Sequence, residues 1–378
     1  MGSRPGRRTP LTGILLERIQ REGPLTYAAF MEACLYHPEH GYYTARVPGT
    51  GQSDYLTSVE TGQLFGCLLA RQLAEMWEQL ERPARFEVVE CGAGRGRLAE
   101  AILPWVDKHA RDFASALHLT LVEISEGMRA QAQRALASYG MRVECAAALP
   151  VRGIVGCLLS NELVDALPVH RVVQRREALR EIYVGAQDGK LVEVEGELSS
   201  QELSRYLERY GKPLEEGQLA EVHPAALAWL EGAAAALKRG FLLTIDYGYP
   251  ARELYGPAHQ RGTFTAYRDH RTSEDWLEEP GRQDLTAHVN FTALEERGRE
   301  LGLTLLGCPE QAQFLLSLLR ASEFRDLPAG GAAAPREQLA SRVELQQLIH
   351  PEGLGANFKV LIQAKGVEGA RLTGLAPP

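Results

Sequence analysis

Residues 88–103, VVECGAGRGRLAEAIL, place an acid and three glycines at alternate positions between an apolar run and a helical pattern. These residues are Glu90, Gly92, Gly94 and Gly96. Glycine loses more conformational freedom on folding than any other residue, so three in one short loop require a physical reason. Without Cβ atoms, the loop can lie close to a ligand and direct its N–H groups, and the N-terminus of the following helix, toward a negative group. The spacing therefore predicts a ligand-binding loop.

Two carboxylates narrow the class of ligand. Glu90 ends the strand before the loop, where it would repel a diphosphate and attract an ammonium group, and the GxGxG spacing differs from the GxGxxG of dinucleotide folds. Glu123, at the end of the next predicted strand, can accept two ribose hydroxyls. S-adenosylmethionine satisfies these conditions because it carries a carboxylate, an amino group and an adenosine ribose. One alternative is that these residues only form a tight turn between a strand and a helix, with two solvated acids at the strand ends. A nicotinamide dehydrogenase is a further alternative, which Glu90 and the glycine spacing disfavour.

A second group of polar residues follows the predicted fourth strand, in LLSNELVDALPVHRV. It contains Asn161, Glu162 and Asp165. Substrates meet the cofactor at this carboxyl edge of open α/β sheets. The two acids could orient a cationic substrate or accept its proton, so we predict catalytic roles for Glu162 and Asp165 and a cofactor contact for Asn161. The alternative is a helix N-cap, which would explain one acid but not both.

A third group lies in PGRQDLTAHVNF, a segment with little core character. We predict catalytic roles for Asp284 and His288, since a histidine near a methyl-transfer centre could accept or orient a proton at neutral pH. TIDYGY places Asp246 and Tyr247 at the end of the fifth strand, at the same edge.

The elements that would position these residues alternate along the chain. Residues 11–83 carry helical periodicity, and from residue 84 short apolar strands alternate with helices, which predicts a parallel sheet covered on both faces. We expect the helix that begins near Arg97 to kink or end at Pro104. Another helix is predicted to begin at Pro224 and to end before Gly240. The pattern of residues 169–198 predicts an antiparallel insertion around AQDGK. Residues 249–290 have little periodicity, and we expect them to form a long functional loop or cap.

Composition excludes several classes of protein. The net charge of −8 over 378 residues argues against a nucleic-acid-binding protein. No apolar run approaches the length of a membrane span. The six cysteines lack C-x-x-C spacing and the pair in HPEH has no second ligand pair nearby, so we predict no metal site and a reducing compartment. We expect a cytoplasmic protein, or a mitochondrial matrix protein if the chain is eukaryotic.

Several motifs in this order resemble the MidA-like family of S-adenosylmethionine-dependent methyltransferases, whose mitochondrial members assist respiratory complex I assembly by methylating an arginine. The matching stretches are FMEACLYHPEHGYYT, SDYLTSVETGQLFGCLLARQLAEMW, VVECGAGRGRLAEAIL, SNELVDALPVHRVV, LLTIDYGY and QDLTAHVNFTAL. The glycine motif is shared by the whole methyltransferase superfamily, whereas SNELVDALPVH and QDLTAHV are specific to this family.

The resemblance implies a Rossmann-like α/β fold with a seven-stranded class I methyltransferase sheet. It implies a helical N-terminal segment, residues 1–83, that covers the cofactor site. The methyltransferase domain would follow over 84–378, with insertions at about 169–222, 249–290 and 308–355. The resemblance also places Asp54, Tyr55 and Thr57 near the cofactor.

The implied reaction is methylation of an arginine on a protein partner, such as a complex I subunit. Arginine is a difficult nucleophile because its guanidinium stays charged and delocalised, and carboxylates such as Glu162 and Asp165 can localise that charge and receive the proton. Two alternatives remain. One is a methyltransferase of a small molecule or another side chain, and the other is an assembly factor that retains the pocket without turnover. The sequence indicates no oligomeric state.

Overall fold

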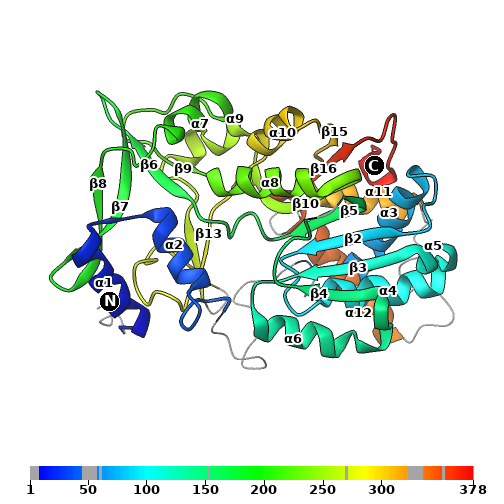
Figure 1. The fold of residues 1–378 in the computed structure, drawn as a ribbon. Helices are drawn as coiled ribbons and strands as arrows, with labels where there is room; N and C mark the ends of the chain where they lie inside the picture. Colours follow the sequence, from blue (N-terminus) through cyan, green and yellow to red (C-terminus); the bar gives the residue numbers. More distant parts are fainter. Residues whose placement is uncertain are drawn as a thin grey trace. The chain divides into compact units, whose positions relative to one another are not determined.

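The computed structural model describes residues 8–44, 58, 62–151, 153–268, 271–321, 335–350 and 354–377 (Figure 1). The chain divides into two compact units. Unit 1 comprises Met1–Tyr55, Val164–Trp229 and Gly248–Glu296, and unit 2 comprises Leu56–Leu163, Leu230–Tyr247 and Arg297–Pro378. No helix in the described part of the chain has the length and apolar character that crossing a membrane requires.

Unit 2 is built on a mostly parallel sheet in the order β15-β16-β10-β5-β2-β3-β4 (Figure 1). Strands β2, β3, β4, β5 and β10 pair in parallel, and β16 is antiparallel to both β10 and β15. A short strand, β14, pairs with Gly248 and Tyr249 at the end of β10, and all of these residues belong to unit 1. With β14 the sheet has eight strands among the described residues. The predicted α/β fold is confirmed. The strand bounds are β2 Phe86–Cys91, β3 Leu117–Val122, β4 Val143–Ala146, β5 Ile154–Asn161, β10 Leu237–Tyr249, β14 Val289–Asn290, β15 Thr304–Gly307 and β16 Phe358–Lys365.

Helices connect these strands, as the alternating pattern predicted. Their bounds are α3 Leu64–Gln79, α4 Arg97–His109, α5 Arg111–Ala116, α6 Glu126–Ala135, α8 Pro224–Ala236, α10 Phe291–Glu300, α11 Gln311–Ala321, α12 Pro335–Ile349 and α13 Leu354–Asn357. Helix α4 continues past Pro104, so the helix does not end there, and a kink at Pro104 stays a prediction. Pro104 is exposed, which lets water hydrate the carbonyl group that loses its donor.

Gly240 does not end a helix, which corrects a second expectation. Helix α8 ends at Ala236 and Gly240 lies inside β10. A Cβ on Gly240 would lie 1.9 Å from the carbonyl oxygen of Gly156 in β5, and one on Gly156 would lie 2.0 Å from that of Glu87 in β2. Glycine at these positions therefore permits the close approach of three neighbouring strands.

Among its described residues, unit 1 contains two antiparallel sheets. One has the order β1-β7-β6-β9 with β8 paired to β7, and the other has the order β12-β11-β13. The strands are β1 Leu25–Thr26, β6 His170–Gln174, β7 Leu179–Gln187, β8 Lys190–Gly196, β9 Leu219–Val222, β11 Thr265–Arg268, β12 Arg271–Ser273 and β13 Asp284–Thr286. The helices of this unit are α1 Pro10–Glu22, α2 Tyr27–Tyr36, α7 Glu202–Tyr210 and α9 Ala251–Leu254.

The predicted antiparallel insertion is confirmed by the β7–β8 hairpin. Its turn residues, Asp188 and Gly189, both have positive φ angles, 50° and 71°, as a tight two-residue hairpin turn requires. The segment 249–290 contains β11, β12 and β13, so the expectation of a long loop is wrong for these described residues, and a role as a cap stays a prediction. Side chains of α1 and α2 share a buried apolar core with β6, β7 and β13. The predicted division of the chain at residue 83, and a segment covering the cofactor site, stay predictions.

Candidate functional site

The strand order of unit 2 reverses between β2 and β5. Numbered along the chain, the seven strands of the continuous path run 3-2-1-4-5-7-6. Ligands of open α/β sheets bind beyond the carboxyl ends of the strands at such a reversal. The glycine loop follows β2, and Asn161 and Glu162 lie at the end of β5. The two loops are neighbours, because a Cβ on Gly92 would lie 3.0 Å from Leu163.

The three loop glycines have positive φ angles, 75° at Gly92, 53° at Gly94 and 78° at Gly96, but their surroundings differ. A Cβ on Gly96 would lie 3.1 Å from the side chain of Leu136, so glycine at this position lets the loop pack closely against Leu136. At Gly94 no atom lies within 4 Å of such a Cβ. Among the described residues, Gly94 therefore leaves space beside the loop, and its contact with a ligand stays a prediction.

Glu123 anchors the glycine loop. Its Oε2 accepts from the backbone N–H of Gly94 at 2.9 Å, and its Oε1 from that of Ser125 at 2.8 Å. This anchoring contact was not predicted from the sequence. Each carboxylate oxygen can accept more than one hydrogen bond, so Glu123 retains acceptor capacity for hydroxyl groups. Its contact with a ribose stays a prediction.

Glu90 is buried at the end of β2, with 6% of its surface exposed. Burial, followed by the charge of Glu123, raises the pKa of Glu90 to about 8. A nearby cation would favour the charged form of such a carboxyl group. Glu90 therefore has the properties of a receptor for an ammonium group.

Glu162 has an unusual backbone conformation. Its φ of 52° is uncommon for a residue with a side chain. Its N–H donates to the carbonyl oxygen of Ile245 at 2.9 Å, and its Oε1 accepts from Ser58 N at 2.9 Å and from Asn161 Nδ2 at 3.1 Å. No helix begins at this point, because the described residues 162–169 form turns and bends, so the N-cap alternative is wrong. Sparsely populated conformations of this kind concentrate at functional sites.

Asn161 presents an acceptor next to Glu162. Its Oδ1 is buried and has no hydrogen-bond partner among the described residues. A buried acceptor without a partner costs free energy, so it favours a ligand that supplies a donor. Thr57, Asp54 and Tyr55 lie outside the described residues, and their predicted proximity to the cofactor stays a prediction.

In unit 1 the structure brings together Asp165 and Asp284, of which 6% and 9% is exposed. Tyr43 donates its hydroxyl to Asp284 Oδ1 at 2.7 Å, and the backbone N–H of Ala287 donates to Asp165 O at 3.1 Å. Burial and then both carboxylates raise the pKa of Tyr43 and of Tyr267. Neither tyrosine was predicted from the sequence, although Tyr43 belongs to the motif HGYYT.

His288 belongs to a different group of side chains in unit 1. Its ring lies 5.4 Å from that of Tyr249 and 6.2 Å from that of His259. Burial, followed by the charge of His259, lowers the pKa of His288 to about 4. The side chain is therefore neutral at pH 7. Among the described residues, no three His, Cys, Asp or Glu side chains are grouped so that they could hold a metal ion.

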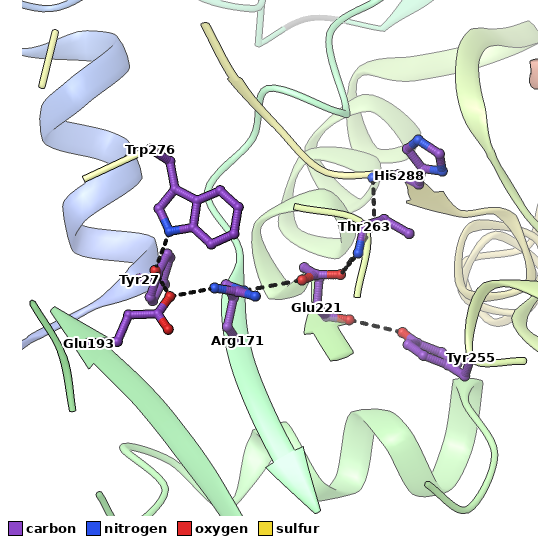
Figure 2. A network of polar contacts seen from close by, with 8 residues as sticks. All are labelled: Tyr27, Arg171, Glu193, Glu221, Tyr255, Thr263, Trp276 and His288. Carbon is purple, nitrogen blue, oxygen red and sulfur yellow. Dashed lines mark hydrogen bonds and ion pairs between the residues drawn. The ribbon is translucent and has the colours of Figure 1, made fainter. Parts of the chain in front are cut away.

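A polar network fixes the backbone of His288, as Figure 2 shows. The N–H of His288 donates to Thr263 Oγ1 at 3.1 Å, and Thr263 donates to Glu221 Oε2 through its N–H at 2.7 Å and its hydroxyl at 3.1 Å. Glu221 in turn pairs with Arg171, which also donates to Glu193 at 2.7 Å. The sequence pattern gave no sign of this network, because its members come from distant strands.

Arg171 is the centre of this network and is almost fully buried, with 2% exposed. Its guanidinium carbon lies 4.9 Å from the rings of Tyr27 and Trp276 and 5.5 Å from that of Phe264. Tyr27 also donates its hydroxyl to Glu193 and accepts from the indole N–H of Trp276 (Figure 2). The network thus connects α2 with β6, β8 and β9 inside unit 1.

Comparison with known proteins relates this site to a family. A family model described as "Putative S-adenosyl-L-methionine-dependent methyltransferase" matches residues 68–308. The mitochondrial protein arginine methyltransferase NDUFAF7 homolog of Drosophila melanogaster is 29% identical, over 95% of this chain and 85% of that protein. The mitochondrial protein arginine methyltransferase NDUFAF7 of Homo sapiens is 26% identical, over 96% of this chain and 86% of that protein.

Solved structures agree with the family match. A protein from Burkholderia thailandensis, whose crystal structure has S-adenosyl-homocysteine bound, superposes on this chain with a TM-score of 0.87. The two are 31% identical, and the superposition covers 99% of this chain and 98% of that protein's chain. A native crystal structure of a protein from the same organism superposes with a TM-score of 0.85 at 30% identity, covering the same shares. The similarity therefore extends over nearly the whole chain, and it includes a neighbour that binds the demethylated form of the predicted cofactor.

Proposed function

This chain belongs to that family of S-adenosyl-L-methionine-dependent methyltransferases, and we propose that its methyl acceptor is an arginine side chain of a protein. The family and its cofactor agree with the expectation from the motifs. One observation carries the choice of acceptor: Glu162, at the carboxyl end of β5, is a carboxylate held in a strained backbone conformation beside the glycine loop. The names of the curated relatives support the same choice.

We assign the cofactor to the loop at the reversal of the sheet. Gly92, Gly94 and Gly96 shape the loop, and the open space at Gly94 fits the close approach of a ligand. Glu90 would receive the amino group and Glu123 the ribose hydroxyls. The remaining proposed contacts are Asn161, whose buried Oδ1 suits a donor, and Thr57.

S-adenosylmethionine supplies a methyl group on a positively charged sulfur, which keeps the electron pair of the broken S–C bond. The acceptor nitrogen of arginine needs a localised electron pair to form the new N–C bond, although the guanidinium charge is normally delocalised. A carboxylate that grips the opposite N–H groups localises the charge and receives the proton that leaves the nitrogen. Glu162 performs this role in our proposal, and Asp165 and Asp284 are proposed as further acids. Because the pKa of His288 is lowered to about 4, His288 is a weak base at pH 7, and its proposed role is to orient a proton rather than to accept one.

The partner is a protein that presents an arginine, and the motifs resemble those of proteins that act on a complex I subunit. The curated relatives are mitochondrial proteins. In a bacterium the corresponding location would be the cytoplasm.

The test is methyl transfer from labelled S-adenosylmethionine to extracted proteins of the source cell, with mapping of the modified residue by mass spectrometry. We expect the mass increment of one or more methyl groups on arginine. Glu162→Gln should lower kcat by about 100-fold and leave the affinity for S-adenosyl-homocysteine within about 2-fold, as expected for loss of a proton acceptor.

The matched control is Glu202→Gln, an exposed acid in the first turn of α7. Label found only on small metabolites would reject arginine as the acceptor. Binding of S-adenosyl-homocysteine without any transfer would favour a non-catalytic assembly factor.

A further inference from the structure

Unit 1 contains a cluster of side chains whose chemistry matches a planar cation. The cluster consists of Asp165, Asp284, Tyr43, Tyr267 and Thr286 and is called the carboxylate–tyrosine cluster below. We propose that it binds the guanidinium group of the substrate arginine and selects arginine over lysine. This inference rests on the proposed function and assigns to Tyr43, Tyr267 and Thr286 a role in substrate specificity.

The geometry of the cluster orients one carboxylate with two phenol rings. Tyr43 donates its hydroxyl to Asp284 Oδ1 at 2.7 Å. Tyr267 in β11 lies directly opposite Asp284 in the register of β13. Tyr36 stacks on Tyr43, with ring centroids 5.7 Å apart, and donates its hydroxyl to the carbonyl oxygen of Ala166, next to Asp165. These contacts hold the acidic groups in defined positions.

Thr286 supplies an independent indication of a ligand. It is 3% exposed, and its Oγ1 has no hydrogen-bond partner among the described residues. It lies two positions after Asp284 in β13, so both side chains point to the same face of the strand. The neighbouring Ala287 N–H donates to Asp165 O, which brings the second acid to this strand. A buried hydroxyl without a partner favours a ligand that carries N–H donors.

The electrostatic field of the cluster favours a cation. After burial, the charges of Asp165 and Asp284 are causes of the raised pKa of both Tyr43 and Tyr267, so both acids act on both rings. The phenols therefore stay neutral and keep their hydrogen-bond donors. Aromatic rings also attract a cation placed over their faces.

Guanidinium fits this arrangement better than ammonium. It carries five N–H donors in one plane, so a single guanidinium can form hydrogen bonds with several carboxylate and hydroxyl oxygens. The lysine ammonium is a compact charge with three donors, and burying it costs more hydration free energy. The cluster should therefore prefer arginine.

The test is a calorimetric titration of the full-length protein, saturated with S-adenosyl-homocysteine, with N-acetyl-L-arginine methylamide and with the corresponding blocked lysine. We expect the arginine compound to bind about 10-fold more tightly than the lysine compound. Asp284→Asn should weaken arginine binding by about 10-fold and Tyr43→Phe by about 3-fold or more, because each removes a charge or an orienting hydrogen bond.

Two control variants use matched chemistry away from the cluster. They are Asp112→Asn, at the exposed start of α5, and Tyr183→Phe, whose hydroxyl donates to the carbonyl oxygen of Glu197. Neither should change the affinity for the blocked arginine. Thr286→Val separates ligand binding from folding. The variant removes a buried hydroxyl that has no partner among the described residues, so it should maintain or raise the melting temperature and still weaken arginine binding by about 3-fold.

Kinetics distinguish failure of this inference from failure of the proposed function. For a protein substrate, Tyr43→Phe and Thr286→Val should raise KM more than they lower kcat. Arginine methylation by the unmodified protein with an unchanged KM in both variants would overturn the cluster as the binding site and leave the proposed function standing. Equal affinity for blocked arginine and blocked lysine would also overturn it. Absence of methyl groups on arginine would reject the proposed function itself.

Discussion

At the scale of single residues, Glu90 shows how binding and stability oppose each other. Its carboxyl group is buried beside the charge of Glu123, which raises its pKa to about 8. Below that pH the folded protein holds the group neutral, and above it the protein must bury a negative charge. The same burial prepares the carboxylate for a cationic amino group.

Glu90→Gln should stabilise the ligand-free protein in a pH-dependent way. In the folded protein the pKa of the Glu90 carboxyl group lies above its value in the unfolded chain. The folded state is therefore most stable at low pH, where the group is protonated, and loses stability as the pH rises through about 8. The variant should therefore melt at a temperature about 2 °C or more above that of the unmodified protein at about pH 9 and show little difference at about pH 5. Scanning calorimetry at both pH values checks this, and an equal shift at both would contradict it.

The same substitution should weaken cofactor binding. Gln cannot supply the negative charge that an ammonium group requires, so the affinity for S-adenosyl-homocysteine should fall by about 10-fold or more. Titration calorimetry at neutral pH measures the change. Glu87→Gln, on the same strand, serves as the control, and an unchanged affinity in Glu90→Gln would remove the residue from the cofactor site.

Gly94 offers a second residue-scale prediction. An alanine Cβ at this position would lie within 4 Å of no atom of the described residues, so its cost to stability arises from the positive φ and should be about 1 kcal/mol. Its methyl group would occupy the space assigned to the cofactor and lower that affinity by about 10-fold or more. Gly217→Ala, at a φ of 80° and also with no described atom within 4 Å of the added Cβ, should cost similar stability with normal binding. Equal affinities in both variants would contradict the assignment.

At the scale of elements, Arg171 joins strands of unit 1 that are remote in sequence. It pairs with Glu221 of β9 and Glu193 of β8 while three aromatic rings surround it. Removing one member of a buried ion pair leaves an uncompensated charge. The pairing of these strands, and through Thr263 the position of His288, therefore depends on this one side chain.

Arg171→Met should destabilise the protein by about 3–5 kcal/mol, because Glu221 then remains buried with its charge uncompensated. Denaturant unfolding measures the loss. The double variant Arg171→Met with Glu221→Gln should regain part of it. Arg297→Met, which removes partly exposed ion pairs with Glu231 and Glu300, is the control and should cost about 1 kcal/mol or less. Stability of Arg171→Met equal to that of the control would contradict this account.

Element boundaries were predictable where the responsible residues are neighbours in sequence. The alternation of apolar strands with helices predicted the parallel sheet, and AQDGK predicted the β7–β8 turn. The expectation for Gly240 is wrong because a glycine that ends a helix cannot be distinguished, from the sequence alone, from a glycine that permits close approach of two strands. Only the position of Gly156 in the adjacent strand distinguishes them.

At the scale of the whole molecule, the predicted site residues divide between the two units. Glu90, Glu123, Asn161 and Glu162 belong to unit 2, whereas Asp165, Asp284 and His288 belong to unit 1, and the chain passes from one unit to the other after Leu163. Cofactor binding should therefore affect the two units unequally.

Hydrogen exchange should show this difference. A saturating concentration of S-adenosyl-homocysteine, about 100 times its Kd, stabilises the state that binds it by about 2.7 kcal/mol. We expect increased protection in residues 90–97, 123–126 and 161–163, and little change in the β7–β8 hairpin. Mass-spectrometric detection of exchange checks this, and protection confined to the hairpin would contradict the assignment of the cofactor to unit 2.

The sequence by itself determined the class of fold, the glycine loop and the family, because periodicity, turn residues and short motifs are written in neighbouring positions. Tertiary structure alone decided that Tyr43 lies on Asp284, 241 positions away, that Glu123 anchors the glycine loop and that Arg171 is enclosed by aromatic rings. Such contacts depend on how separate elements pack. No local pattern encodes that packing, because many partners of the same type could satisfy each residue equally well.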